Sequence, residues 1–402
     1  MKIGFVTASN ITNNDGYTIR VLSELTQLKK QNINTAVLSF LHLRFWGNIS
    51  GIRSFVEKVR SLGYPIWLIP VFPDNQLPLG YKLVDKYYLS ITKRFVHNEK
   101  IEILHCQATL AGYIGQMVAE ETKIMSISDM HGLLSEEQAH RFKKNNVALE
   151  RLNALEKKAV QNKAIIFVSS AMQDFVKNQL GSTSQIQSII PCAVNTNLFV
   201  FQKKARESLR AEWGVKSEDP VFVYLGSYSF YQKIDLALLI FKQMNLYFKN
   251  AKMLILTPPS DVQPIKNLLQ EIDIDASSVL IYSVQHSDVP KFLSACDIGF
   301  LLRDNILLNN VSSPTKFGEY IATGVPVITS EGILDIKKAV QDYKLGFLYK
   351  GDYQNLAHFV HSVMETRNEW ITKCENYAQN NYSWDLFGNN LSALYSKFAQ
   401  EK

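Results

Sequence analysis

Cysteine is scarce in this chain, and its spacing fits neither a disulfide framework nor a zinc site. The four cysteines, at positions 106, 192, 296 and 374, are widely separated, and no two of them form a CxxC pair. Zinc sites and small disulfide scaffolds both place cysteines at short, regular spacings. The pattern therefore indicates a reducing compartment and gives no metal site.

Long apolar runs are missing as well. No stretch approaches the ~18 apolar residues of a membrane span. Met1 and Lys2 run straight into an apolar strand, so this start is too short for a signal-peptide core. The net charge of +6 is mildly basic, without the dense clusters of a nucleic-acid-binding protein. We therefore expect a cytoplasmic protein, free or peripheral on the inner face of the membrane, with no nucleic-acid partner.

Two sequence signatures of bound groups are also absent. The chain has no GxGxxG, so the usual dinucleotide fingerprint is not supported. No Asp-x-Asp stands at the end of a predicted strand. We expect neither a cofactor nor a metal.

Apolar strands alternate with amphipathic helices along most of the 402 residues. With 46% hydrophobic and 20% charged residues, the chain can build a large core and suits two or three domains. The alternation predicts an α/β fold of doubly wound sheets, which bind ligands at the carboxyl ends of their strands. Strands are predicted at 3–7, 35–40, 66–69, 103–105, 124–128, 164–168, 187–190, 221–225, 253–257, 279–282, 298–302, 325–328 and 346–348.

Two predicted helices carry a distinctive pattern of charge. The helix predicted over 81–98 bears four basic residues and several aromatic ones, which allows contact with a membrane interface. Ordinary solvation of one helix face explains the same pattern. The four basic residues are Lys82, Lys86, Lys93 and Arg94. A long charged helix is predicted over 136–161.

Asp129 and His131 follow the strand predicted at 124–128, at an end where this fold places its chemistry. Histidine titrates near neutral pH and can hydrogen-bond sugar hydroxyls. We take both residues as catalytic candidates, in which Asp129 either orients His131 or acts itself. His105 ends the preceding strand and is more simply explained as a buried core histidine.

Residues 312–328 read SSPTKFGEYIATGVPVI, which predicts a helix start, a short helix and a buried strand. Ser313 is expected to cap the helix, Pro314 to take its first position, and Gly324 to end it. The N–H groups and dipole of such a helix start attract anions.

Thr315 and Glu319 are four residues apart and share a face near that helix start. A carboxylate repels phosphate, but it can accept both hydroxyls of a ribose. Phosphate on the amides and ribose on the acid make a nucleotide site. An ordinary capped amphipathic helix is the alternative.

This segment resembles the donor-site signature of GT-B glycosyltransferases, most closely the family 4 enzymes of bacterial surface-polysaccharide pathways. The resemblance implies two Rossmann-like domains facing a central cleft. It implies that Glu319 holds the ribose of a nucleotide sugar. Ser312, Ser313, Thr315 and Lys316 are then the phosphate end of the donor site.

Other segments match this family in part. Residues 129–132 are similar to its histidine loop, in which the histidine faces the transferred sugar. Gly226 and Lys233 match a phosphate-binding pair, although Ser227 stands where the family has arginine. Val284 lies in the loop that holds the nucleobase through backbone contacts. Gly16 is a partial match to the family's first glycine loop, unless it simply forms a turn with the preceding Asp15.

The resemblance also divides the chain. We expect an acceptor domain at 1–192, a hinge at 193–219 and a donor domain at 220–381. The last helix, within 382–402, is expected to cross back to the first domain. Val311 occupies the place of the first of two family glutamates, so the sugar's contacts differ from the usual pattern.

The implied activity is transfer of a sugar from a UDP- or GDP-sugar to a glycan, lipid-linked or protein acceptor in cell-surface polysaccharide or glycoconjugate synthesis. Retention without metal is implied, with helix amides, Lys233 and Lys316 stabilising the departing diphosphate. Inversion instead requires Asp129 or His131 as general base. Two alternatives stay open: an epimerase acting on a nucleotide sugar, or a non-catalytic partner subunit, which Val311 and Ser227 would favour.

Overall fold

The computed structural model describes residues 1–13, 15–71, 80–141 and 146–400. The chain forms two compact units, each built around its own parallel sheet. The N-terminal unit comprises Met1–Cys192 together with Trp384–Lys402, and the C-terminal unit comprises Ala193–Ser383. Every predicted strand overlaps an observed one, so the predicted α/β fold is confirmed.

The N-terminal unit contains a seven-stranded parallel sheet in the order β3-β2-β1-β4-β5-β6-β7. The order reverses between β1 and β4, which makes this the point where a doubly wound sheet binds its ligand. The strands are β1 (Lys2–Thr7), β2 (Asn34–His42), β3 (Ile66–Val71), β4 (Ile103–Gln107), β5 (Met125–Met130), β6 (Ala164–Phe167) and β7 (Ile186–Ile189).

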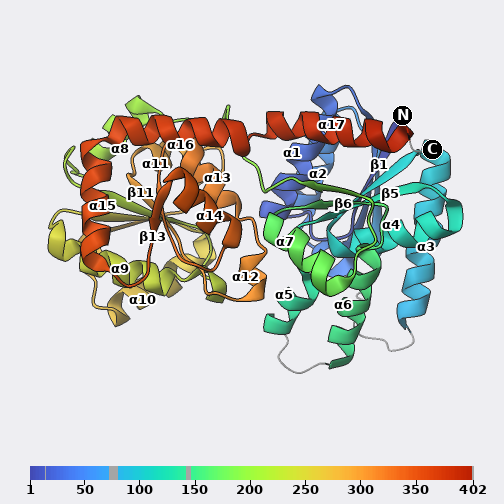
Figure 1. Ribbon diagram of the computed structural model, residues 1–402, viewed down its shortest axis with the longest axis horizontal. Coiled ribbons are helices and arrows are strands. Elements are labelled where there is room, and N and C mark those ends of the chain that lie inside the picture. The colour runs from blue at the N-terminus through green and yellow to red at the C-terminus, as the bar shows by residue number, and fades with distance from the viewer. Residues whose placement is uncertain (14, 72–79, 142–145, 401–402) are drawn as a thin grey trace. The chain divides into compact units, whose positions relative to one another are not determined.

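Helices cover both faces of this sheet, which is why its strands are almost continuously apolar (Figure 1). The α-helices are α1 (Gly16–Lys30), α2 (Ile49–Ser61), α3 (Gly80–Glu99), α4 (Ala108–Thr122), α5 (Leu134–Arg141), α6 (Asn146–Ala159), α7 (Ser170–Phe175) and α17 (Trp384–Gln400). Short helical turns are η1 (Leu43–Phe45) and the π-helical η3 (Val176–Leu180).

The last helix, α17, packs on α1 within the N-terminal unit. Gln27 donates to Asp385 over 3.1 Å, and Gln31 donates to Asn389 over 2.8 Å. The helices approach closely because Gly388 has no side chain: a Cβ there would lie 2.7 Å from Gln27 Oε1. The inner face of α17 buries Leu391, Tyr395 and Phe398.

The C-terminal unit contains a six-stranded parallel sheet in the order β10-β9-β8-β11-β12-β13, with its reversal between β8 and β11. Alternate residues of β8 enter two hydrophobic clusters, since successive side chains point to opposite faces. The strands are β8 (Val221–Leu225), β9 (Lys252–Leu256), β10 (Val279–Tyr282), β11 (Ile298–Leu301), β12 (Val327–Thr329) and β13 (Gly346–Leu348).

Its helices lie on both sides of the sheet (Figure 1). The α-helices are α8 (Lys203–Glu212), α9 (Ile234–Tyr247), α10 (Val262–Glu271), α11 (Val289–Ser294), α12 (Leu307–Asn310), α13 (Thr315–Ala322), α14 (Leu334–Tyr343), α15 (Tyr353–Glu365) and α16 (Arg367–Asn381). The 3-10 turns are η4 (Phe230–Gln232), η5 (Pro259–Asp261) and η6 (Ala276–Ser278).

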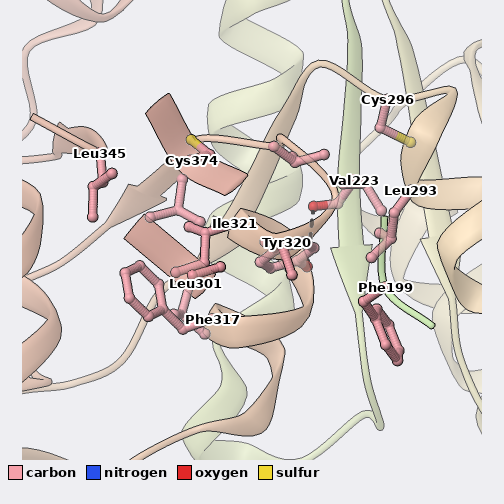
Figure 2. Close-up of a cluster of buried hydrophobic side chains, with 14 of the residues drawn as sticks. Phe199, Val223, Leu293, Cys296, Leu301, Phe317, Tyr320, Ile321, Leu345 and Cys374 are labelled. Atoms are coloured by element: carbon pink, nitrogen blue, oxygen red, sulfur yellow. Dashed lines mark hydrogen bonds between the residues drawn. The ribbon is translucent and has the colours of Figure 1, made fainter. Parts of the chain in front are cut away.

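Tyr320 of α13 is buried at the point where β8 and β11 stop pairing (Figure 2). Its hydroxyl accepts a 2.8 Å hydrogen bond from the backbone N–H of Leu225 and lies 3.5 Å from the carbonyl of Val223. The ring packs against Gly299, where a Cβ would come within 3.0 Å of the ring atoms. The tyrosine therefore holds α13 against the carboxyl ends of two neighbouring strands.

Residues 193–219, expected to be a hinge, are instead part of the C-terminal unit. Phe199, Trp213 and Val215 join its hydrophobic core, and α8 lies within this range. Helices α8 and α16 were not predicted because both are rich in polar residues. Helix α8 is attached by ion pairs, such as that of Arg206 with Asp297 over 2.7 Å, whereas α16 buries Ile371, Cys374 and Ala378 on one face.

The long helix predicted over 136–161 lies partly outside the described residues. Helices α5 and α6 occupy its two ends. Across the ranges that the structure describes, each helix is too short or too polar to span a membrane.

The hydroxyl of Tyr320 can be tested by Tyr320→Phe, which leaves the Leu225 N–H without its acceptor. We expect the free energy of unfolding to fall by about 1–3 kcal/mol in urea denaturation. Tyr343→Phe is the matched control, since that ring is 56% exposed on α14, and should change stability by no more than about 0.5 kcal/mol. Equal effects of the two changes would contradict the role given to Tyr320.

Candidate functional site

Helix α13 begins at Thr315, one residue later than predicted. Pro314 is its N-cap residue, with an extended backbone at φ −66° and ψ 125°, and its own side chain provides no cap. The prediction that Ser313 is the cap residue and Pro314 the first helical one is therefore wrong. Because ψ of Pro314 is extended, the helical turn starts only after it. A helix start whose N-cap residue is proline offers backbone N–H groups and a positive dipole end, which favour binding of an anion.

The other end of α13 agrees with the prediction. Gly324 follows the helix with φ +75°, a left-handed conformation that suits glycine. A Cβ at this position would also lie 2.9 Å from the backbone of Ile371. The glycine therefore permits both the turn and the close approach of α16.

Glu319 lies one turn into α13 and is 7% exposed. Its Oε1 is 2.8 Å from Nε2 of His286, which comes from the loop after β10. The ring of Phe199 packs against this histidine at a centroid distance of 5.2 Å. Among the described residues no partner holds the second carboxylate oxygen, so His286 orients the carboxylate while one oxygen stays available to a ligand.

Lys316 points toward the end of β8. Its ammonium group donates to Oε1 of Gln232 and lies 5.3 Å from the centre of the Tyr224 ring. Burial lowers its pKa well below the usual value, and the positive charge of Arg303 lowers it further, against an opposing effect of Glu319. The site thus holds a lysine whose charge is poorly compensated.

Gly226 follows β8 with φ +136°, a conformation that other residues rarely adopt. A Cβ there would overlap the ammonium group of Lys316. This glycine therefore lets the lysine reach the end of the strand. Ser227, found where the family has arginine, accepts a 3.0 Å hydrogen bond from Gln232 and belongs to the same loop.

Lys233 is the N-cap residue of α9, in a left-handed conformation at φ +48°. Its ammonium group is 3.4 Å from Asp304 and 3.9 Å from Asp235. Two carboxylates therefore share its charge, which weakens its field at any bound anion.

Arg303 was missed by the sequence analysis. It follows β11, is 7% exposed, and donates to the carbonyl of Leu302 over 3.0 Å. Its guanidinium carbon lies 5.3 Å from the centre of the Tyr231 ring. In the part of the chain that the structure describes, no carboxylate forms an ion pair with it. A cation directly after a predicted strand was the signal that could have identified it.

The remaining predicted donor residues lie around α13 and β10. Ser312 donates through both its backbone N–H and its hydroxyl to the carbonyl of Asn309, over 3.1 and 2.7 Å. Val284 lies after β10, partly buried against the core, and Val311 is buried after α12. The contacts with a nucleotide sugar that the sequence analysis assigned to these residues therefore stay predictions.

In the N-terminal unit, β5 continues two residues beyond its prediction, so that Asp129 pairs with Gln107 on one side and Ile166 on the other. Its carboxylate receives Arg20 of α1, with Nη2 at 3.0 Å from Oδ1 and 3.1 Å from Oδ2. The same guanidinium lies 3.0 Å from Glu24. All three charged residues are almost completely buried.

Burial alone would raise the pKa of Asp129, but Arg20, followed by His131, outweighs it and holds this pKa well below its usual value. Glu24 behaves oppositely, because burial and the charge of Asp129 raise its pKa well above the usual value. His131 lies 3.5 Å from Asp129, and burial lowers its pKa despite that neighbour. Asp129 is thus held ionised 3.5 Å from His131, whose burial favours the neutral imidazole.

His105 belongs to the same buried network. Its Nδ1 lies 2.5 Å from the hydroxyl of Tyr395 in α17, and Gln107 donates to Glu24 over 2.7 Å and to Asp129 over 3.2 Å. Glu24, His105 and Asp129 bring ligand atoms within 4.8 Å of one another, as a metal site would. Arg20 already contacts both carboxylates there, and its charge opposes a cation, so we regard the network as structural.

Gly16 is the first residue of α1, directly after the N-cap residue Asp15. The Asp15 side chain accepts a 3.0 Å hydrogen bond from the N–H of Thr18. This explains Asp15 as a helix cap, and the binding role of Gly16 stays a prediction.

Arg20 also contacts both points where the chain passes between the units. Its Nη1 donates to the carbonyls of Ile190 and Pro191 over 3.0 Å each. Its guanidinium carbon lies 5.7 Å from the ring centre of Trp384. One buried cation therefore joins Asp129 to the segment that leaves the N-terminal unit and to the one that returns.

Comparisons with known proteins agree with the α/β fold of the two units. Residues 205–384 match the family model described as glycosyl transferases group 1. No match was found among curated protein sequences.

Solved structures share the fold over nearly the whole chain. Anabaena HepE in complex with UDP has a TM-score of 0.74 at 14% identity, covering 99% of this chain and 100% of that one. Sucrose-phosphate synthase from Thermosynechococcus elongatus gives 0.74 at 15% identity, covering 100% of both. The lipopolysaccharide outer core galactosyltransferase WaaB gives 0.68 at 13% identity, covering 99% and 100%.

The two parallel sheets and these neighbours define the class of protein, which has the GT-B architecture. The family match identifies residues 205–384 as a group 1 glycosyltransferase domain.

The buried pair of Arg20 and Asp129 leads to a prediction. Asp129→Asn removes the main anionic partner of a buried guanidinium, so we expect guanidinium chloride denaturation to show a loss of about 3–5 kcal/mol. Asp385→Asn is the matched control, because it breaks the pair of Asp385 with Lys30, in which both side chains are about half exposed, and should cost no more than about 1 kcal/mol.

The pair of Arg20 and Asp129 also makes the free energy of unfolding depend on pH. The folded pKa of Asp129 is lowered, so its stabilising contribution is complete above the unfolded value of about 3.9 and is lost as the pH falls through the folded value. The difference between wild type and Asp129→Asn should therefore persist at neutral pH and shrink only in strong acid. A difference that vanished near pH 6 would contradict this assignment.

Proposed function

We propose that this glycosyltransferase moves a sugar from a UDP- or GDP-sugar to a glycan, lipid-linked or protein acceptor in the synthesis of cell-surface polysaccharide or a related glycoconjugate. The observation that carries the donor assignment is Glu319, held by His286 one turn inside a helix whose N-cap residue, Pro314, provides no side-chain cap. One oriented carboxylate and one open helix start suit a ribose and a diphosphate.

Two comparisons support the choice of donor and pathway. HepE was crystallised with UDP and with UDP-glucose, so we give UDP-sugars priority. WaaB acts on the outer core of lipopolysaccharide, as its name states, which supports a surface glycan as the product.

In this proposal, each residue contacts a different part of the donor. Glu319 accepts the ribose hydroxyls, and the backbone near Val284 faces the nucleobase. The amides after Pro314, together with Lys316 and Lys233, stabilise negative charge that develops on the departing diphosphate. Because this stabilisation uses fixed donors and cations of the chain, we propose that the reaction needs no metal.

We further propose that the reaction retains the anomeric configuration and that His131 of the N-terminal unit acts on the sugar. Asp129 is a poor general base, because Arg20 holds its carboxylate ionised and occupied. Its assigned task is to position His131. Product analysis by NMR, with the transfer assay run in EDTA, tests both retention and metal independence.

Loss of the Glu319 carboxylate should weaken donor binding directly. We expect Glu319→Ala to raise the dissociation constant of UDP about 10- to 100-fold in titration calorimetry, because hydrogen bonds to a charged group contribute about 1.5–3 kcal/mol. Glu365→Ala is the matched control, since that carboxylate is exposed at the end of α15. Unchanged UDP affinity in Glu319→Ala would remove the ribose assignment.

Helix α3 is the proposed contact with the inner face of the membrane. Its exposed side combines Lys82, Lys86 and Arg94 with Leu83, which is 69% exposed, and Tyr87, which is 40% exposed. Cationic and apolar side chains together suit the surface of an anionic bilayer.

Vesicle binding tests this contact. The double change Lys82→Gln and Lys86→Gln should weaken binding to vesicles with one quarter anionic lipid about 10- to 30-fold, given about 1 kcal/mol for each basic residue. The matched control changes two exposed lysines on α8, Lys203→Gln and Lys204→Gln. Equal binding by both double variants would exclude α3 as the contact.

A further inference from the structure

Three cations gather at the carboxyl ends of β8 and β11, and their neutralisation is unequal. Lys233 has two carboxylates within 4 Å. Lys316 has a neutral amide as its hydrogen-bond partner, and the charge of Glu319 acts on it only from nearby. Arg303 has no carboxylate partner in the described part of the chain. Among the described residues, Lys316 and Arg303 are therefore the two cations of this group without a directly paired carboxylate.

Arg303 cannot relieve this imbalance by losing its proton, because a guanidinium stays charged in proteins. It is 7% exposed, so its charge is also poorly hydrated. The positive charge of Arg303 lies close enough to Lys316 to lower the pKa of the lysine. Two buried like charges without an acid between them are stabilised when an anion binds to both.

The structure holds the guanidinium in a fixed place. The backbone N–H of Arg303 donates to Ser330 over 2.8 Å, and the Ser330 hydroxyl donates back to the Arg303 carbonyl over 2.5 Å. The ring of Tyr231 lies under the guanidinium plane. Only one of its N–H groups is used by the Leu302 carbonyl, so others remain for the paired oxygens that a guanidinium binds best.

Its neighbours all belong to the proposed donor site. Arg303 ends β11 and Gly226 ends β8, two adjacent strands at the reversal of the sheet. Lys316 reaches Gly226 from the first turn of α13. The guanidinium, the ammonium and the start of α13 thus belong to the same edge of one sheet.

We propose that Arg303 and Lys316 together bind the diphosphate of the donor, with Arg303 as the principal cation and Lys233 as a secondary one. This proposal rests on the proposed function, because it names the group in the donor site that holds the leaving group. Arg303 is then a binding residue that remains in place throughout the reaction and stabilises the nucleoside diphosphate as it departs.

The test compares UDP with uridine, which lacks the diphosphate. In Arg303→Gln, the dissociation constant of UDP should rise about 10- to 100-fold, as expected for the loss of a charge-assisted hydrogen bond. Uridine affinity, measured by ligand-observed NMR, should stay within about twofold of wild type, since the nucleoside does not reach Arg303. Lys249→Gln removes an exposed charge between α9 and β9, at the opposite end of the strands, and should leave both ligands unaffected.

The test distinguishes failure of the proposed function from failure of the role given to Arg303. If wild type binds neither UDP nor GDP, the proposed function fails. If wild type binds UDP and a folded Arg303→Gln binds it equally well, only the role of Arg303 is overturned. If Arg303→Gln does not fold, Tyr231→Leu decides: it removes the ring under the guanidinium at a half-buried position, and should weaken UDP several-fold with uridine unchanged. UDP affinity equal to wild type in that variant would also overturn the proposal.

Discussion

The hydroxyl of Tyr320 occupies the place where β8 and β11 separate, and the proposed donor site depends on that contact. It replaces a missing strand partner for Leu225, and Gly299 leaves room for its ring. Glu319 precedes Tyr320 directly, and Lys316 lies one turn earlier on the same short helix. Fixing one aromatic residue of α13 therefore also fixes the carboxylate and the ammonium group relative to the strand ends.

Buried charge is used in two ways in this protein. In the N-terminal unit, Arg20 is matched by Asp129 and Glu24, with Gln107 donating to both carboxylates. Such a network is satisfied by the protein itself and holds its parts in place. In the C-terminal unit, Arg303 lacks an acid among the described residues, which is the condition expected of a group that binds an external anion. A buried cation that is paired with acids serves the structure, whereas a buried cation without such a pair indicates a binding site.

Local patterns in the sequence revealed the α/β fold, the glycine that ends α13 and the neighbourhood of Glu319. They did not reveal contacts between distant residues. His286 and Glu319 are 33 positions apart, and no periodicity links them. The family pattern drew attention to Ser227 as a lost arginine, whereas a cation at the next strand end, Arg303, received no weight. The start of α13 was misplaced because proline tolerates both the cap and the first helical position. Helix α8 is too polar to show an apolar stripe, and the stripe of α16 at Ile371, Cys374 and Ala378 was overlooked among its polar residues.

The N-terminal unit is assembled from two separate stretches of chain, Met1–Cys192 and Trp384–Lys402. A ribosome synthesises the whole C-terminal unit before it releases the helix that packs on α1 and supplies Tyr395 to His105. During those seconds the nascent sheet lacks one helix and exposes apolar surface. Newly made chains thus pass through an interval in which a chaperone, or premature association between copies, competes with the arrival of α17.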